Sequence, residues 1–149
     1  MFDPFRARRS LICCLLPCLT LFVSGCGDDG NDDTGGGDEI EIQGSWLSNF
    51  DSTENISSDA WDTQGVVLFD NSENVAVTQN AADAEFDPGK FNKIVWTEPE
   101  ADRFHYCTVD FGLDTAELAR ASTHTADATD PEHTGCGGFS WTQLTRVEP

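Results

Sequence analysis

The chain has few basic residues and no long hydrophobic segment. Only 8 of its 149 residues are lysine or arginine, against 27 aspartates and glutamates, and the formal net charge is −19. This balance argues against nucleic acids and anionic lipid surfaces as partners, because both carry negative charge themselves. The uncharged apolar run at 11–23 has 13 residues, which is too short to span a bilayer comfortably, and Pro17 interrupts it.

The motifs of common catalytic sites are also missing. Neither a Ser–His–Asp arrangement nor a glycine-rich phosphate loop can be identified. His124 and His133 share a polar segment with Asp127, Asp130 and Glu132, but their spacing matches no compact zinc template. The sequence therefore predicts a protein that is not an enzyme, with no catalytic residue, no metal site and no cofactor.

The first part of the chain has the features of an export signal. Three arginines precede the apolar run, and the run ends in Val23-Ser24-Gly25-Cys26. A basic region, an apolar region and small residues in this order are typical of a signal peptide. The tetrapeptide resembles the lipobox of bacterial lipoproteins. The resemblance implies that residues 1–25 are a lipoprotein signal peptide, and that a lipid attached to Cys26 holds the protein to a bilayer.

A polar tether is expected after the anchor. Residues 27–38 contain no apolar side chain and cannot build a core, so residues 26–38 are predicted to be an acidic linker to a head domain at 39–149. Loss of the leader, with three arginines and Asp3, leaves 5 basic and 26 acidic groups, a net charge of −21. In well-studied envelopes an aspartate after the lipidated cysteine retains lipoproteins in the inner membrane. Gly27 occupies that position here, which favours the outer membrane.

Two cysteines remain for the head domain. Of the six cysteines, three lie in the leader and Cys26 carries the lipid, which leaves Cys107 and Cys136. An even pair in an oxidising compartment predicts a disulfide. In the chain-entropy model this cross-link stabilises the fold by about 3–4 kcal/mol.

The head domain is predicted to be mainly β. Ile40, Ile42, Trp46 and Phe50 share one parity, which predicts a half-buried strand over this segment. Further strands are expected at 65–69, 74–78, 91–97, 104–111 and 139–147. About six to eight short strands joined by hairpin-length turns favour a small antiparallel β-barrel or a sandwich.

One short helix interrupts the strand pattern. Asp114 is expected to cap it, Glu117 follows at the spacing of a capping box, and the helix should end near Ala121. The polar residues 123–133 after it are expected to form a loop. Gly135 and its neighbouring glycines predict a close backbone approach beside the disulfide.

The two ends of the head domain resemble one family of barrels. Gly44-Ser45-Trp46 resembles the Gly-x-Trp that opens the first strand of lipocalins and related calycin barrels. In that family a basic residue of the last strand packs across the tryptophan, and Arg146 is placed for this role. The resemblance implies a closed barrel that is able to enclose a small apolar ligand.

Aromatic residues supply the remaining candidates for a binding site, either as the lining of a ligand cavity or as plain core. They are Trp46, Trp61, Trp96, Phe104, Tyr106, Phe139 and Trp141. The preferred interpretation is a lipid-anchored envelope protein with a non-catalytic head that binds a small apolar ligand. The alternatives are a protein-interaction or structural envelope module with a filled core and, with the least support, a hydrolase.

Overall fold

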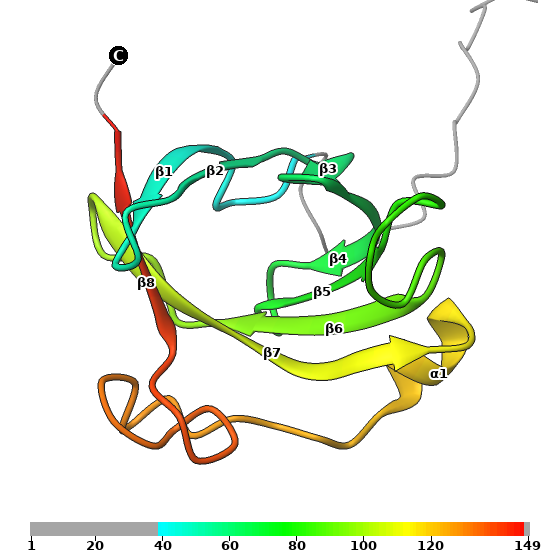
Figure 1. Ribbon diagram of the computed structural model, residues 1–149. Coiled ribbons are helices and arrows are strands. Elements are labelled where there is room, and N and C mark those ends of the chain that lie inside the picture. Colours follow the sequence, from blue (N-terminus) through cyan, green and yellow to red (C-terminus); the bar gives the residue numbers. More distant parts are fainter. Residues whose placement is uncertain (1–38, 148–149) are drawn as a thin grey trace, which may run out of the picture. The chain divides into compact units, whose positions relative to one another are not determined.

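The computed structural model describes residues 39–147. Eight antiparallel strands follow one another around a closed barrel, and β1 pairs with β8 to complete the ring (Figure 1). The elements are β1 (Gly44–Ser48), β2 (Thr53–Ile56), β3 (Ala60–Trp61), β4 (Gln64–Asp70), β5 (Val75–Gln79), β6 (Phe91–Trp96), β7 (Arg103–Leu113), α1 (Ala116–Ala121) and β8 (Thr142–Arg146). The prediction of a mainly β fold is confirmed, and of the two predicted architectures the structure adopts the barrel.

The segment before β1 covers one end of the barrel. The backbone N–H of Ile40 donates to Ser58 in the β2–β3 connection at 3.0 Å, and that of Glu41 donates to Asn71 in the β4–β5 connection at 3.1 Å. The indole N–H of Trp96, the last residue of β6, donates to Glu41 at 2.7 Å. Residues 39–43 therefore close this end, which we call the closed end.

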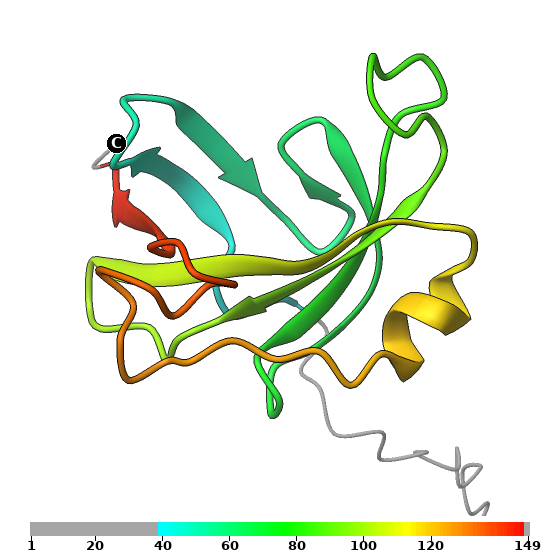
Figure 2. The ribbon, with the colours of Figure 1, turned by 60° about the horizontal axis from the view of Figure 1, so that its bottom comes forward.

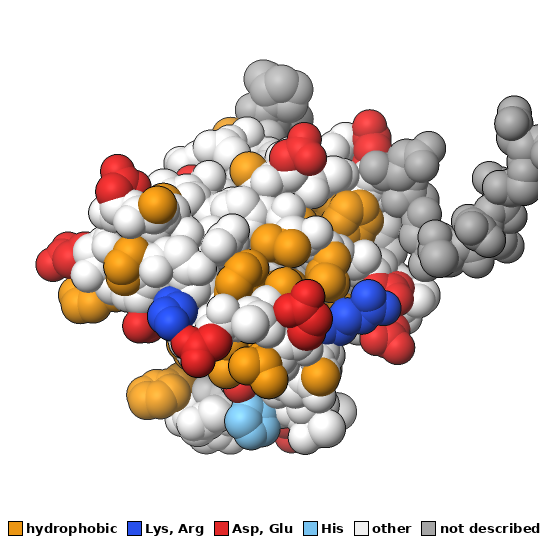
Figure 3. Space-filling model, turned by 90° about the vertical axis from the view of Figure 1, so that its right-hand side faces the viewer, with side chains coloured by type: hydrophobic (Ala, Val, Ile, Leu, Met, Phe, Trp, Pro, Cys, Tyr) orange, Lys and Arg blue, Asp and Glu red, His pale blue; other side chains and the backbone are white. Residues whose placement is uncertain are grey.

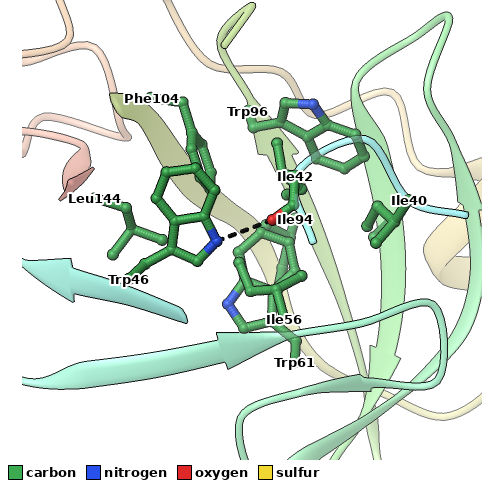
Figure 4. Packing of buried hydrophobic residues seen from close by; sticks show 10 residues of the cluster. Ile40, Ile42, Trp46, Ile56, Trp61, Ile94, Trp96, Phe104 and Leu144 are labelled. Atoms are coloured by element: carbon green, nitrogen blue, oxygen red, sulfur yellow. Dashed lines mark hydrogen bonds between the residues drawn. The ribbon is translucent and has the colours of Figure 1, made fainter. Parts of the chain in front are cut away.

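A dry core fills the half of the barrel next to the closed end. Inward-facing residues of seven strands and two residues of the covering segment form it: Ile40, Ile42, Trp46, Ile56, Trp61, Ala76, Ile94, Trp96, Phe104 and Leu144. Figure 4 shows the larger of these side chains pointing toward one another, with the indole N–H of Trp46 bonded to the carbonyl of Ile42 at 2.9 Å. The rings of Trp46 and Phe104 pack edge to face with centroids 4.7 Å apart, a favourable aromatic geometry.

The opposite end of the barrel is polar, and we call it the open end. The β1–β2, β3–β4, β5–β6 and β7–β8 connections lie here, because consecutive strands alternate in direction. Thr78 and Asn92 face inward, and both are almost fully buried. Gln64 Oε1 accepts hydrogen bonds from the Thr78 hydroxyl and, at 3.2 Å, from the Asn92 amide, so the buried polar atoms are satisfied.

The helix packs against the outside of the barrel. α1 contacts β5, β6 and β7, and the outward-facing Val77 of β5 is fully buried. The predicted helix is present, but its N-cap is Thr115, whose side chain accepts from the N–H of Leu118. Asp114, the expected cap, instead forms a salt bridge with Lys90. In the part of the chain from 39 to 147, no helix is long and apolar enough to cross a membrane.

Most strand boundaries lie within two residues of the predictions, and two boundaries differ by more. The strand expected over residues 40–50 is limited to Gly44–Ser48, since residues 39–43 turn across the closed end and Phe50 lies in a turn with 68% of its surface exposed. The last strand begins at Thr142 instead of Phe139, because residues 136–139 form a tight turn closed by hydrogen bonds between Cys136 and Phe139. The short strands β2 and β3 were not predicted.

Candidate functional site

A pocket of about 190 Å³ lies at the open end. Its walls come from β2, β3, β4, β6 and β7 and from the β1–β2 and β3–β4 connections. The lining residues are Ser52, Thr53, Glu54, Trp61, Asp62, Thr63, Gln64, Ile94, Tyr106 and Thr108. Most of them are polar, so the pocket differs in character from the dry core on which it borders.

Glu54 occupies the centre of this arrangement. β2 alternates, and Glu54 shares the inward parity of Ile56, which is buried in the core. The Trp61 indole N–H donates to Glu54 Oε2 at 3.0 Å, and the Tyr106 hydroxyl donates to Glu54 Oε1 at 3.0 Å. The two aromatic rings pack edge to face with centroids 5.1 Å apart. Packing and hydrogen bonding together fix the position of the carboxylate.

The Glu54 carboxylate keeps capacity for further partners. An ionised carboxylate offers about four lone-pair sites, and Trp61 and Tyr106 use two of them. None of the residues that line the pocket is lysine or arginine, whereas Asp62 adds a second acidic group. The pocket therefore presents hydrogen-bond acceptors and negative charge to a ligand.

Tyr106 is held in its neutral form. Burial raises the pKa of the Tyr106 hydroxyl, and the neighbouring Glu54 carboxylate raises it further. Both effects disfavour the phenolate, since one removes water and the other repels negative charge. Tyr106 therefore remains a hydrogen-bond donor to Glu54 throughout the physiological pH range.

A larger groove of about 480 Å³ lies on another part of the surface. It runs between the β6–β7 hairpin and the loop after α1, and its walls include Trp96, Phe104, His105 and Pro131. Burial is the largest effect on His105 and lowers its pKa, so its imidazole is neutral near pH 7. His105 Nε2 lies 3.2 Å from the side-chain nitrogen of Gln143. The groove thus holds a neutral imidazole among both apolar and charged side chains.

The Gly-x-Trp segment and Arg146 meet as expected. The Arg146 guanidinium lies 4.3 Å from the Trp46 ring centroid and donates to the carbonyl of Gln43 at 3.3 Å. Gly44 has φ +143°, and a Cβ added to it would lie 2.7 Å from an Arg146 nitrogen. A glycine is therefore required here both by the backbone conformation and by the close approach of Arg146.

The disulfide forms between the predicted cysteines. Cys107 on the outer face of β7 is bonded to Cys136, with a Cα–Cα distance of 5.7 Å. This bond fastens the β7–β8 connection, which runs along the outside of the barrel (Figure 2). A Cβ added to Gly135 would lie 2.6 Å from the Trp141 indole nitrogen, so the close approach expected at this glycine is present.

The aromatic candidates lie in different environments. Trp46, Trp96 and Phe104 belong to the core, whereas Trp61 and Tyr106 contribute both to the core and to the open-end pocket. Trp141 is buried outside the core cluster, and its indole N–H has no hydrogen-bond partner among residues 39–147. Phe139 lines neither of the two pockets described above and does not join the core, because it projects from the turn at 136–139 and is 77% exposed.

The two histidines of the polar loop each pair with an aspartate. His124 Nδ1 lies 2.6 Å from Asp110, and His133 Nδ1 lies 2.8 Å from Asp130. Burial alone would raise the pKa of Asp110, but hydrogen bonds from Ser122 and His124 outweigh it, and the pKa lies below its usual value. Within residues 39–147 no three histidines, cysteines, aspartates or glutamates come close enough together to hold a metal ion.

Glu54 and the open-end pocket were not predicted from the sequence. The only available signal was an acidic residue on the inward parity of Thr53–Ile56, a segment too short to be recognised as a strand. The signal peptide, Cys26 and the tether lie outside the described residues. Comparison with known protein families, curated proteins and solved structures finds no match for this chain.

Proposed function

We propose that this chain is a lipid-anchored, non-catalytic binding protein of a bacterial cell envelope, and that its barrel binds a small polar ligand at the open end. The observation that carries the proposal is the Glu54 carboxylate, which is fixed by Trp61 and Tyr106 and faces a pocket of about 190 Å³. Small-molecule sites contain a few fixed polar groups that orient the ligand, and Glu54 is such a group.

The filled core changes the expected class of ligand. Most of the aromatic side chains that were candidates for an apolar cavity pack against one another in the core. The space that remains is lined mainly by hydroxyl, amide and carboxylate groups. A polar ligand would satisfy these groups, whereas an apolar ligand would bury them without partners at a cost of about 1–3 kcal/mol for each group.

The proposed anchor rests on the sequence before the head domain. The lipobox-like segment supports lipidation of Cys26. Position 27 holds glycine and not aspartate, which supports an outer-membrane location. The described chain begins at residue 39, at the closed end of the barrel. The open-end pocket lies at the opposite end of the barrel from residue 39.

The pocket is tested by filling it. Thr108 faces inward beside Glu54, and Thr108→Phe should occupy the pocket. Fragments of small polar compounds are screened by ligand-observed NMR against the detergent-solubilised protein and this variant, with thermal unfolding as a check of the fold. We expect binders that a folded Thr108→Phe variant loses. If no compound binds, or if the variant retains binding, the open-end pocket is not the ligand site.

The proposed lipid anchor is tested by measuring the intact mass of the protein. Protein isolated from its native host should begin at Cys26 and carry acyl chains, and Cys26→Ser should release it from membranes, since several chains at about 0.8 kcal/mol per buried CH₂ hold a protein firmly. An unmodified Cys26 would exclude the lipoprotein assignment. Density-gradient fractionation then shows which membrane holds the protein.

The second candidate function is a protein-interaction module. It is favoured by four phenylalanines with most of their surface exposed: Phe50, Phe86, Phe111 and Phe139. Figure 3 shows hydrophobic side chains exposed between acidic ones on the side of the molecule that carries α1. Photo-crosslinking groups placed at these phenylalanines in native envelopes should give discrete adducts if this function holds, and none if it does not.

A further inference from the structure

We infer that the open-end pocket selects a small organic cation that carries an alkylated ammonium group. The inference rests on the proposed function, since it names the class of ligand for that same pocket. It follows from three properties of the pocket: its uncompensated charge, its aromatic walls and its size.

Among residues 39–147, no basic side chain forms a salt bridge with the acidic groups of the pocket. Glu54 faces inward, and both of its described partners, Trp61 and Tyr106, are neutral donors. Three basic residues of the head are engaged elsewhere. Lys90 pairs with Asp114, Lys93 donates to the carbonyl of Ser122, and Arg146 lies over Trp46. A half-buried carboxylate is stabilised by a countercharge, and a cationic ligand would supply it.

The aromatic residues beside Glu54 favour an organic cation. Trp61 and Tyr106 line the pocket and hold the carboxylate between them, and Tyr106 is half-buried, so a bound cation would contact both a negative charge and the accessible part of the Tyr106 ring. Ring faces attract alkylated ammonium groups, which are more weakly hydrated than metal ions. A bare metal ion would need several carboxylate, histidine or cysteine ligands, and residues 39–147 contain no group of three that meets this requirement.

The same residues argue against a neutral sugar. Sugars are commonly recognised by an exposed aromatic face, but Trp61 is only 4% exposed and packs against Trp96 and Tyr106. The volume of about 190 Å³ also limits the ligand. At about 30 Å³ for each water molecule, it corresponds to roughly six waters, which suits a compact ammonium compound.

The test uses choline and its neutral isostere 3,3-dimethylbutan-1-ol, titrated by calorimetry into the detergent-solubilised full-length protein. The two probes have the same shape and differ in charge. We expect saturable binding of choline and binding of the isostere that is at least about tenfold weaker, because charge-assisted contacts contribute more than neutral ones. Equal binding of the two probes, or no binding of choline, overturns the inference.

Two matched variants locate the effect. Glu54→Gln keeps the size of the side chain but removes its charge, and we expect it to weaken choline binding about tenfold to a hundredfold. Glu41→Gln is the control, because Glu41 accepts an indole N–H from Trp96 at 2.7 Å but lies outside the pocket. The control should bind choline like the unmodified protein. Equal losses in both variants, or no loss in Glu54→Gln, would contradict the inference.

Failure of this inference and failure of the proposed function give different results. If neutral polar fragments bind and Thr108→Phe abolishes their binding, while choline does not bind, the pocket is a ligand site and only the cationic class is wrong. If neither choline nor any neutral fragment binds, both the inference and the proposed function fail.

Discussion

Trp96 at the closed end and Trp61 at the open end each donate an indole N–H to a glutamate, but the two glutamates lie in different surroundings. Glu41, the partner of Trp96, is exposed to solvent. Glu54, the partner of Trp61, is half-buried and faces inward beside Tyr106. The same pair of residue types therefore ties down a covering segment at one end and fixes a charge in a pocket at the other.

The difference between the two ends shows where this barrel obtains stability and where it retains capacity to bind. The closed end removes large apolar side chains from water, which is the main stabilising term in a domain of this size. At the open end, polar groups such as Thr78 and Asn92 occupy inward-facing positions. Their hydrogen bonds satisfy them but add little net free energy to the stability of the fold. The open end is therefore the part of the barrel that can change with least cost to folding.

The largest expected effect comes from a pair of substitutions in one strand. Phe104 and Thr108 both face inward from β7, Phe104 in the closed-end core and Thr108 in the open-end pocket. Phe104→Ala should destabilise the protein by about 3–5 kcal/mol through the cavity it leaves. Thr108→Ala should cost at most about 1 kcal/mol. Urea unfolding measures both, and similar losses would show that the two ends contribute equally to stability.

Removal of the disulfide should have the next largest effect. Cys107 and Cys136 are 29 residues apart, and a loop of that size contributes about 3–4 kcal/mol in the chain-entropy model. The double variant Cys107→Ala with Cys136→Ala should lose about this amount and expose the β7–β8 connection to proteolysis. Cleavage that begins instead in the core strands would show that the disulfide holds the whole barrel together.

A substitution beside Arg146 at the closed end should have a smaller effect on stability. Gly44→Ala combines an unfavourable φ of +143° with a contact of 2.7 Å to Arg146, and should cost about 1–3 kcal/mol. Gly65→Ala is the control, because no atom lies within 4 Å of the added Cβ, and its effect should stay within about 0.5 kcal/mol. Thermal unfolding compares them. Equal effects would mean that the approach of Arg146 to Trp46 does not constrain the closed end.

The closed end was largely predictable from the sequence, although one element was interpreted wrongly. Alternation indicated the long strands, and Gly44, Trp46 and Arg146 meet as the family resemblance implied. Ile40 and Ile42 were assigned to the first strand because a turn that buries alternate residues has the same pattern as a strand. The pattern identified their burial, but it could not show that they cover the end of the barrel.

The open end was not predictable, because its contacts join residues that are distant in the sequence. Glu54 and Tyr106 are 52 positions apart, and only closure of the barrel brings them together. The strands that carry Glu54 and Trp61 have four and two residues, too few to show a period. An acidic side chain on an inward position also contradicts the ordinary pattern, and such departures are expected at functional sites.

The smallest expected effect concerns the pH response of the open end. The chain has a single tyrosine, so ultraviolet absorbance reports the ionisation of Tyr106 alone. Burial and the Glu54 carboxylate raise its pKa above the ordinary value of 10.0. Since the raised pKa belongs to the folded state, Tyr106 adds stability at pH values below 10, and this stability is lost as the pH rises from 10 through the folded-state pKa.

Substitution of Glu54 at the open end and of Glu41 at the closed end should have different effects on the titration of Tyr106. Glu54→Gln removes a neighbouring negative charge and should lower the Tyr106 pKa toward 10.0, so that absorbance at 295 nm rises at a lower pH. Glu41→Gln should leave the titration unchanged, because Glu41 bonds to Trp96 and does not contribute to the pKa of Tyr106. A Tyr106 that titrates normally in the unmodified protein would mean that the phenol is solvated, and that the open-end pocket does not hold Glu54 in the way described.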